Sequence, residues 1–313
     1  MIIKKCTPPY FPGSPLAIEV VNIRHYAPHR HTDAIEFVYC FSGRLEVTIA
    51  HQRLLLLANE MVTIDHDDIH YMTSDQDNMT LIVHIDLKNT SCKCSDIKYI
   101  FFSCATILYK PHQEKALELI YDILISSAYI YAAQKEDALK YYKSIGNMLI
   151  DILIEKFCWF SVEDLTAEEN SKYRDRLNNI CTYVQRNYKN KITISQIARE
   201  EYIDENYFSQ FIKRTSFKSF TFMVNYIRCY EAEKLLLFTN MSIQEISDAC
   251  GFSSKKYFHK YFRICWNTTP LRHRKHYQKI SALPHNIRAC PSDELLTAIN
   301  EHMAERQLQK LLK

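Results

Sequence analysis

The chain has very little glycine, 4 residues in 313. Glycine enters backbone conformations that other residues adopt only at a steric cost, so each glycine in so poor a chain marks a position of possible structural need. The sequence also has no stretch of eighteen uncharged apolar residues, which argues against a transmembrane helix and against a membrane partner.

Signals for export are missing as well. The first residues, MIIKKCTPPYFPG, lack the apolar core and the small-residue cleavage site of a signal peptide. The eleven cysteines are odd in number and follow no repeated spacing. We therefore expect reduced thiols and a cytoplasmic location rather than a disulfide framework.

Charge is unevenly distributed along the chain. Residues 171–280 carry 20 Lys and Arg against 9 Asp and Glu, a net +11, whereas residues 1–170 carry 15 against 23, a net −8. Residues 281–313 carry four of each and are neutral. The length suffices for two domains, and 47% apolar with 24% charged residues is typical of a globular protein. A basic block beside an acidic one indicates that one domain meets a polyanion.

The hydrophobic period changes between the first and the second hundred residues. Residues 16–86 contain short segments with strand character, such as AIEFVYCF and MTLIVHIDL, separated by turn-forming residues. Many short strands at this spacing predict an antiparallel sandwich or a small barrel. Residues 112–160 place apolar residues at i, i+3, i+4 and i+7, which predicts two amphipathic helices. The polar stretch 161–176 then predicts a domain boundary.

From about residue 172 the pattern is helical and punctuated by tight turns. Thr193 with Gln196, and Ser242 with Glu245, stand at capping-box spacing, each at the start of a short helix. In both places a turn and a second helix follow, DENYFSQFIKR in the first and SSKKYFHKYFRI in the second. The recurrence predicts an internal duplication of helix-turn-helix units, joined by a long helix over residues 220–238.

Gly251 lies in the turn of the second unit, between EISDAC and SSKKYF. The residue that ends the first helix of such a unit often needs positive φ, which suits glycine, and Ser253 offers an oxygen to cap the next helix. Phe258 and Phe262 share one face of that helix, which predicts core packing. The opposite face belongs to the helix that enters the DNA major groove in such units, so we prefer groove contact to simple solvation. Its residues are Ser254, Lys255, Lys256, His259 and Lys260.

Residues 192–274 resemble the DNA-binding domain of AraC-type transcription regulators. The resemblance rests on IAREEYIDENYFSQFIKR, RCYEAEKLLL and SIQEISDACGFSSKKYFHKYFRICWNTTPLRHR. Within these, the Gly-Phe pair, the Tyr-Phe-x-x-x-Phe spacing and a terminal Pro270-x-x-x-Arg274 are specific in combination. The resemblance implies two recognition helices, held by the helix 220–238, that enter successive major grooves about one helical turn apart.

The first unit departs from the family pattern. Tyr202 and Phe217 stand where the family has glycine in the first turn and after the first recognition helix, and Asn267 replaces the glycine after the second. We therefore expect the first unit to be less regular or to meet its DNA more loosely, although its amides suit adenine. Its candidate DNA contacts are Glu205, Asn206, Ser209, Gln210 and Lys213. Candidate phosphate contacts are Lys218, Arg263 and Arg274.

The strand region contains a second resemblance, to cupins. HRHTDAIEFVYCFSG has the spacing of the first cupin motif, with His29, His31 and Glu36, and NEMVTIDHDDIH resembles the second, with His70. The proline and glycines of that second motif are replaced, by Asp65, Asn59 and Asp67. Histidines at i and i+2 of a strand point to one side, so three imidazoles and a carboxylate can converge inside a barrel. Ligand-pocket or structural residues, partly buried polar pairing and a bound metal all stay open as interpretations.

These observations predict a multidomain β plus α protein with an N-terminal cupin-like β-barrel, a helical connector and a C-terminal all-α domain with two helix-turn-helix units. The expected bounds are 1–100 for the effector-sensing cupin, 101–170 for the connector and dimerisation region, and 171–280 for the DNA-binding domain. Residues 281–313 form a C-terminal helical extension, expected to pack on the DNA-binding domain or on a partner.

The function implied by the resemblance is that of a sequence-specific transcription regulator. We expect it to activate transcription, and we expect no enzyme activity. Its expected partners are double-stranded DNA, a second copy in a homodimer, RNA polymerase and a small-molecule effector. We assign the effector to His29, His31, Glu36 and His70, with a sugar as the expectation from similar sensor cupins, and we expect no metal, cofactor or catalytic residue. The alternatives are a metal-dependent cupin enzyme fused to a DNA-binding domain, and a constitutive DNA-binding protein without effector.

Overall fold

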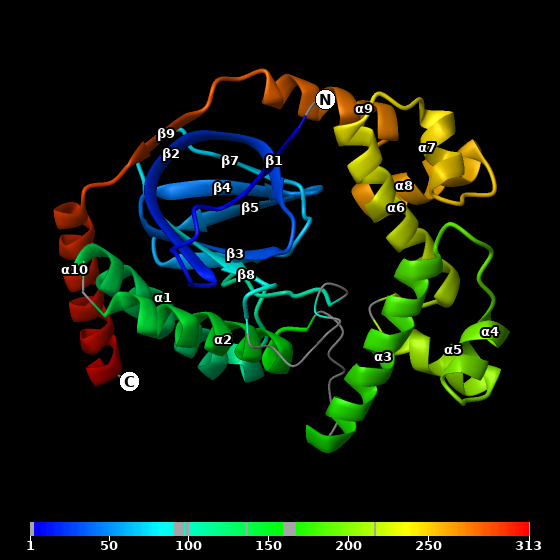
Figure 1. Ribbon diagram of the computed structural model, residues 1–313, viewed down its shortest axis with the longest axis horizontal. Helices are drawn as coiled ribbons and strands as arrows, with labels where there is room; N and C mark the ends of the chain where they lie inside the picture. Colours follow the sequence, from blue (N-terminus) through cyan, green and yellow to red (C-terminus); the bar gives the residue numbers. More distant parts are fainter. Residues whose placement is uncertain are drawn as a thin grey trace. The chain divides into compact units, whose positions relative to one another are not determined.

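The computed structural model describes residues 3–90, 97, 100–134, 137–158, 167–215 and 217–312. The chain divides into two compact units, which are described separately (Figure 1). The barrel unit holds the described residues of Lys5–Ser95, Phe102–Phe157 and Leu283–Lys313, and the helical unit holds those of Met1–Lys4, Asp96–Phe101 and Cys158–Ala282. Among the helices of these described ranges, none is both long enough and apolar enough to cross a membrane.

Antiparallel strands in the order β5-β4-β7-β2-β8-β3-β6 form the sheet of the barrel unit, with β1 and β9 also paired to β2. The strands are β1 Lys4–Cys6, β2 Leu16–His31, β3 Ala34–Ser42, β4 Arg44–Ile49, β5 Gln52–Leu57, β6 Glu60–Ile64, β7 His70–Thr73, β8 Met79–Asp86 and β9 Asn286–Ala289. The sheet curls into a near-closed barrel (Figure 1), which confirms the predicted cupin fold.

Alternation of side chains along the strands explains what fills the barrel. On β5, Leu54 and Leu56 are buried while Leu55 and Leu57 are about half exposed, because successive side chains point to opposite faces of a strand. The buried leucines join one apolar cluster with Val38 and residues of the neighbouring strands. Side chains of the same inward set near one end of the barrel are polar instead, and these form the site described below.

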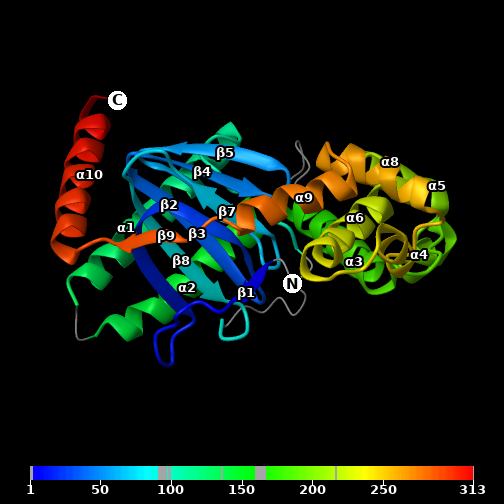
Figure 2. The same cartoon turned by 90° about the horizontal axis from the view of Figure 1, so that it is seen from above.

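Two helices and a returning segment complete the barrel unit. After a short 3-10 turn, η2 (Pro111–Gln113), α1 (Glu114–Ala132) and α2 (Ala138–Lys156) pack on each other and on β2, which confirms the two helices predicted over 112–160. β9 then pairs with β2, and α10 (Ser292–Leu312) packs against α1 and β3 (Figure 2). We call β9 and α10 together the strap.

The prediction for residues 281–313 was wrong. They were expected to be helical and to pack on the DNA-binding domain or on a partner, yet they contain a strand and belong to the barrel unit. The reason is the free edge of β2, where Val21–Ile23 pair with β9, together with the burial of Leu295 and Ile299 of α10. A ladder and a buried apolar face outweigh the polar, weakly strand-like sequence of β9.

The helical unit consists of two helix-turn-helix units that share one long helix. Its helices are α3 Ala167–Asn187, α4 Ile194–Glu200, α5 Glu205–Lys213, α6 Phe220–Phe238, α7 Ile243–Ala249, α8 Lys255–Trp266 and α9 Pro270–Ser281. α6 packs against α5 of the first unit and α8 of the second, so the predicted duplication and the linking helix 220–238 are confirmed. α3 begins at Ala167, inside the predicted boundary stretch 161–176, of which residues 161–166 lie outside the described part.

Side-chain caps define where these helices start. Both predicted capping boxes are present, Thr193 with Gln196 on α4 and Ser242 with Glu245 on α7. At α8 the capping residue is Ser254, whose hydroxyl accepts from the Tyr257 amide, and not Ser253 as the sequence suggested. Ser254 has the extended backbone that an N-cap requires, at φ −167° and ψ 156°.

Different residue types take the left-handed backbone conformation in the turns of the two units. Tyr202 adopts φ +53° in the first turn and Asn267 adopts φ +50° after α8, both at the places where the family has glycine. After α5 the left-handed residue is Lys218, at φ +61°, and not Phe217, which is fully buried in the core. Side chains therefore occupy left-handed positions in the first unit at some steric cost.

Gly251 is required for two reasons. Its φ of +73° is left-handed, and a Cβ added to it would lie 2.3 Å from the carbonyl oxygen of Lys189. Lys189 follows α3, so the second unit's turn packs directly against the backbone that precedes the first unit. Tyr202, at the matching place of the first unit, is 96% exposed. Both turns therefore need the conformation, whereas only Gly251 also lacks room for a side chain.

Candidate functional site

The polar face of α5 is open to solvent. Asp204 caps the helix by accepting from the amides of Asn206 and Tyr207, and Phe208 points into the core. The side chains predicted to contact DNA fall on the opposite face. Of these, Ser209 is half-buried and the others are exposed: Glu205, Asn206, Gln210 and Lys213.

The corresponding face of α8 is more basic. Lys255, Lys256, Lys260 and Arg263 are exposed, as predicted, while Phe258 and Phe262 are fully buried on the other side. His259 is half-buried and its Nε2 has no hydrogen-bond partner. Burial, Lys255 and Arg263 lower the pKa of His259, so its ring is neutral at pH 7 and suits a base edge better than a phosphate.

Two arginines fix the turns that precede the units. Arg274, predicted as a phosphate contact, donates to the carbonyls of Leu236 and Met241, both at 2.8 Å, just before α7. Arg228 of α6 donates in the same way to the carbonyls of Tyr188 and Asn190, before α4. In each unit the helix that follows the recognition helix thus holds the preceding turn in place. The assignment of Arg274 to a DNA phosphate stays a prediction, and the structure adds this second contact of its side chain.

Register brings the predicted histidines of the barrel together. His29 on β2 lies opposite His70 on β7, and Glu36 on β3 lies opposite His84 on β8. His31, two residues beyond His29, faces the same interior. The ligand atoms of His29, His31, Glu36 and His70 all lie within 4.8 Å of one another. We call these four residues with His84 the histidine cluster; each of its side chains is at most 4% exposed.

A single carboxylate lies at the centre of the cluster. Oε2 of Glu36 is 3.2 Å from Nε2 of His31, 3.1 Å from Nε2 of His70 and 3.3 Å from Nε2 of His84. The sequence did not point to His84, although its strand, MTLIVHIDL, shows a lone histidine in phase with the inward Thr80 and Ile82. That phase is the signal by which it could have been found.

Comparison with known proteins agrees with both halves of this description. Residues 197–276 match the helix-turn-helix domain family, and residues 22–86 match the cupin domain family. The chain joins an AraC-type DNA-binding domain to a cupin domain. The HTH-type transcriptional regulator YijO of Escherichia coli is 30% identical over 98 residues, which cover 31% of this chain and 35% of YijO.

Other similarities are weaker but cover a larger share of the chain. The regulatory protein PocR of Salmonella typhimurium is 25% identical over 167 residues, 53% of each chain. The chain thus spans about a third to a half of the length of these curated relatives. Among solved structures, apo ToxT of Vibrio cholerae aligns over 84% of this chain and 97% of its own, at 13% identity and a TM-score of 0.41.

In three histidines of the cupin domain, hydrogen bonds to the backbone show which ring nitrogen carries a proton. Three imidazoles direct Nδ1 to a backbone carbonyl oxygen, which can only accept, so Nδ1 carries the proton. The pairs are His29 with Ala27 at 2.8 Å, His70 with Asp68 at 2.9 Å and His31 with Cys6 at 3.2 Å. The pKa of His29 is lowered well below its usual range by burial and by His70, so its ring is neutral and its Nε2 lone pair faces the cluster without a hydrogen-bond partner. This is the tautomer of metal-binding histidines whose second nitrogen is held by the protein.

The charges of the cluster reflect this crowding. Burial raises the pKa of Glu36, but His70 and His84 outweigh burial and hold that pKa well below its usual range. Burial and the neighbouring His70 hold the pKa of His29 well below its usual range, whereas the Glu36 carboxylate outweighs burial and raises the pKa of His31. Glu36 thus favours the protonated form of His31, and a cation bound here would compete with that proton.

The cupin donor set fits a divalent transition-metal ion. Nε2 of His29 and Oε1 of Glu36 are buried and have no hydrogen-bond partner, while Oε2 of Glu36 is in contact with Nε2 of His70 at 3.1 Å. Three imidazoles and one carboxylate are ligands that zinc, iron and nickel accept. Such an ion, when bound, would neutralise the buried carboxylate and could offer a Lewis-acidic position.

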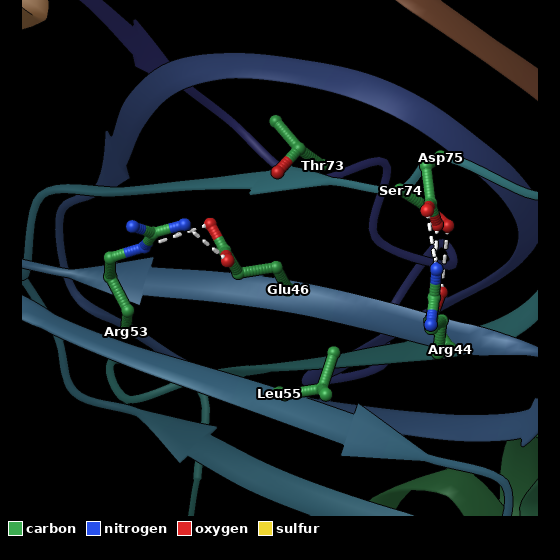
Figure 3. A pocket seen from close by; sticks show the side chains of 7 residues that line it. All are labelled: Arg44, Glu46, Arg53, Leu55, Thr73, Ser74 and Asp75. Atoms are coloured by element: carbon green, nitrogen blue, oxygen red, sulfur yellow. Dashed lines mark hydrogen bonds and ion pairs between the residues drawn. The ribbon is translucent and has the colours of Figure 1, made fainter.

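A hollow on the outer face of β4, β5 and β7 is a less suitable site. Figure 3 shows Arg53 directed at Glu46, with nitrogen–oxygen distances of 3.1 and 2.6 Å, and Arg44 paired with Asp75. The remaining lining residues are Leu55, Thr73 and Ser74. Since carboxylates already neutralise both arginines, the hollow presents no free charge to a ligand and we assign it no role.

Proposed function

We propose that the chain is a sequence-specific DNA-binding transcription regulator. The observation that carries this proposal is the pair of exposed polar faces on α5 and α8, each on the second helix of a helix-turn-helix unit packed on α6. Such helices enter the major groove. Lys255, Lys256 and Lys260 supply charge on α8, while the amides of Asn206 and Gln210 on α5 match the donor and acceptor edge of adenine.

Selection of duplexes from a random-sequence pool by the full chain tests this proposal. We expect the selected duplex to bind at least about 10³-fold tighter than random DNA at the same salt concentration. Protection from cleavage should extend over two successive major grooves, more than about 10 base pairs for each chain. Equal affinity for selected and random DNA would favour a non-specific DNA-binding protein, and a footprint shorter than one helical turn would contradict two inserted helices.

We propose further that the histidine cluster is the effector site of the cupin domain. Its side chains are almost fully buried, and His31, His70 and His84 stand 3.1–3.3 Å from the central carboxylate, which is the spacing of an ion site rather than of a sugar pocket. The unpartnered Nε2 of His29 and Oε1 of Glu36 favour a divalent cation as the effector, in place of the sugar expected from the resemblance. Ion binding would then displace the proton held between His31 and Glu36, so affinity should fall as pH falls.

Titration of chelator-treated protein with Zn²⁺ tests the cluster. We expect one ion for each chain, and an affinity at least about tenfold lower in Glu36→Gln, which removes a ligand charge at constant size. Glu46→Gln changes a carboxylate on the outside of the same barrel and should bind like the unaltered chain. Absence of ion binding with stabilisation by a sugar would restore the sugar hypothesis. Ion binding with turnover of a substrate would support the enzyme alternative.

We also propose that α1 and α2 form the contact of a homodimer. Leu119 and Tyr129 on α1, and Tyr141 and Met148 on α2, are 41–53% exposed. Large apolar side chains that stay exposed on both helices of the pair are what supports this proposal. Sedimentation should show a dimer that Met148→Glu dissociates.

The proposed role as an activator acting on RNA polymerase is decided by transcription of the selected promoter in vitro, where the added protein should raise the yield of transcript.

A further inference from the structure

The strap is joined to the second helix-turn-helix unit by only a few residues. α9 ends at Ser281 and β9 begins at Asn286, so four residues separate the DNA-binding domain from a strand of the cupin sheet. β9 pairs with β2, its Ile287 packs on the apolar cluster inside the barrel, and Leu295 and Ile299 of α10 are buried. The docked strap therefore fixes the end of α9 to the sensor by a short covalent tether.

One attachment of the strap lies on the outer side of β3. His302 of α10 has Nδ1 2.7 Å from Oδ1 of Asn59 and 3.2 Å from the hydroxyl of Tyr39, which itself donates to Asn59 at 3.0 Å. Tyr39 is fully buried and His302 is 7% exposed. Three side chains from a strand, a turn and the strap thus form a closed hydrogen-bonded group, which is sensitive to small movements of β3.

A second attachment leads straight to the histidine cluster. The ring of Tyr26 stacks on His29 at 4.1 Å and 19°, and His285 lies edge-on to the same ring at 5.7 Å. His285 is the residue just before β9. His29 of the cluster and the start of the strap therefore contact the same aromatic ring.

Both attachments are on strands that also supply cluster residues. β3 carries Glu36 on its inner face and Tyr39 on its outer face, three residues apart, and β2 carries His29 and the edge that pairs with β9. Packed interiors transmit displacements because they have few voids. A ligand that moves Glu36 or His29 must therefore also alter the contacts that hold the strap.

We propose that the strap is the output element of the cupin domain: occupation of the histidine cluster changes how firmly the strap is docked, and the strap conveys this change to the second helix-turn-helix unit. The inference rests on the proposed function, since it assumes that the histidine cluster binds an effector and that the helix-turn-helix units bind DNA. It requires the ligand to bind the docked and the released strap with different affinity. By reciprocity, DNA then alters the affinity of the cluster for its ligand.

Hydrogen exchange of the full chain tests the sensor side without DNA. Zn²⁺ should change amide exchange in β9 and in residues 292–304 by about tenfold or more, the change expected when a hydrogen-bonded attachment is gained or lost. Glu36→Gln should show no such change at the same Zn²⁺ concentration. An unchanged strap in the unaltered chain would overturn the proposal, whatever the chain does with DNA.

Variants of the strap test the output side. His302→Ala removes the imidazole bound to Tyr39 and Asn59, Tyr39→Phe removes only a hydroxyl, and Asn300→Ala is a control on the exposed face of α10. Zn²⁺ should change the affinity for the selected duplex by about fivefold or more in the unaltered chain and in Asn300→Ala. In His302→Ala and Tyr39→Phe the response should fall below about twofold while the Zn²⁺ stoichiometry stays unchanged. An undiminished response in both variants would overturn the proposal.

Loss of selective DNA binding would have a different signature. If no duplex is selected, the proposed function fails. The effect of Zn²⁺ on hydrogen exchange in the strap can still be measured, because that experiment uses no DNA. A responding strap without selective DNA binding keeps the strap as an element coupled to the cluster and refutes the regulator. A silent strap with selective DNA binding refutes the coupling and leaves the regulator in place.

Discussion

Replacing Gly251 by alanine adds one methyl group at the turn of the second helix-turn-helix unit. At φ +73° the new Cβ carries the steric penalty of the left-handed region, about 1–2 kcal/mol. It also meets the carbonyl oxygen of Lys189 at 2.3 Å and the Lys189 carbonyl carbon at 2.7 Å. Because these are backbone atoms, the turn or the segment after α3 must shift, and such overpacking adds about 1–3 kcal/mol.

The expected loss of stability follows from these terms. Alanine restricts the unfolded chain and returns about 0.4–1 kcal/mol, so we expect Gly251→Ala to destabilise the DNA-binding domain by about 1–4.5 kcal/mol. For a domain of about 100 residues this lowers Tm by roughly 5–20 °C. Tyr202→Ala is the matched control, because the backbone there is already left-handed with a side chain that is 96% exposed. We expect it to change stability by no more than about 0.5 kcal/mol.

Thermal and urea unfolding of the full chain, followed by far-ultraviolet circular dichroism, measures both variants. The cupin domain should unfold as before, so only one of two transitions should move. Equal effects of the two alanines would refute the argument, because Tyr202→Ala adds neither a Cβ in the left-handed region nor a contact with Lys189. A loss below about 1 kcal/mol in Gly251→Ala would refute both terms.

Further predictions concern DNA, pH and the cluster. Lys256→Ala should reduce discrimination at one or two base pairs by about 1–3 kcal/mol, whereas Arg263→Ala should weaken all DNA alike and reduce the salt slope by about one, as binding at several salt concentrations will show. Burial raises the pKa of Asp65 well above its usual value. Above pH about 4 the carboxyl ionises in the unfolded chain but stays protonated in the folded one, so the free energy of unfolding falls as pH rises above that value. Asp65→Asn should therefore stabilise the cupin domain at pH 7 and less at pH 4, as urea unfolding at both values will show. Zn²⁺ should raise the Tm of the unaltered chain and leave that of Glu36→Gln nearly unchanged.

Local signals were sufficient for much of the helical unit. The capping boxes that begin with Thr193 and Ser242 depend on residues three positions apart, so the sequence locates both short helices without knowledge of the fold. The turn glycine and the two phenylalanines of α8 are likewise local features. The single-residue error at Phe217, in contrast, arose because family spacing does not say which of two neighbours takes the left-handed conformation. The buried core selects Phe217, which leaves that conformation to Lys218.

Features that depend on distant partners were missed. His84 joins the cluster because β8 pairs with β3 in the register that sets it opposite Glu36, and no single segment carries that information. The hydrogen bonds of Arg274 go to carbonyls 33 and 38 residues earlier, at Met241 and Leu236. β9 has little strand character of its own and forms a strand only because β2 offers an unpaired edge.

The return of the chain to the barrel orders events during synthesis. β1 to β8 leave the ribosome before the AraC-type domain, and β9 leaves after it, so the edge of β2 at Val21–Ile23 stays unpaired while more than one hundred intervening residues are made. A chain that stops after α9 contains every proposed DNA contact but leaves that edge open to pairing with other chains. Cleavage near residue 283 should therefore yield fragments that keep every proposed DNA contact but aggregate through the open edge of β2.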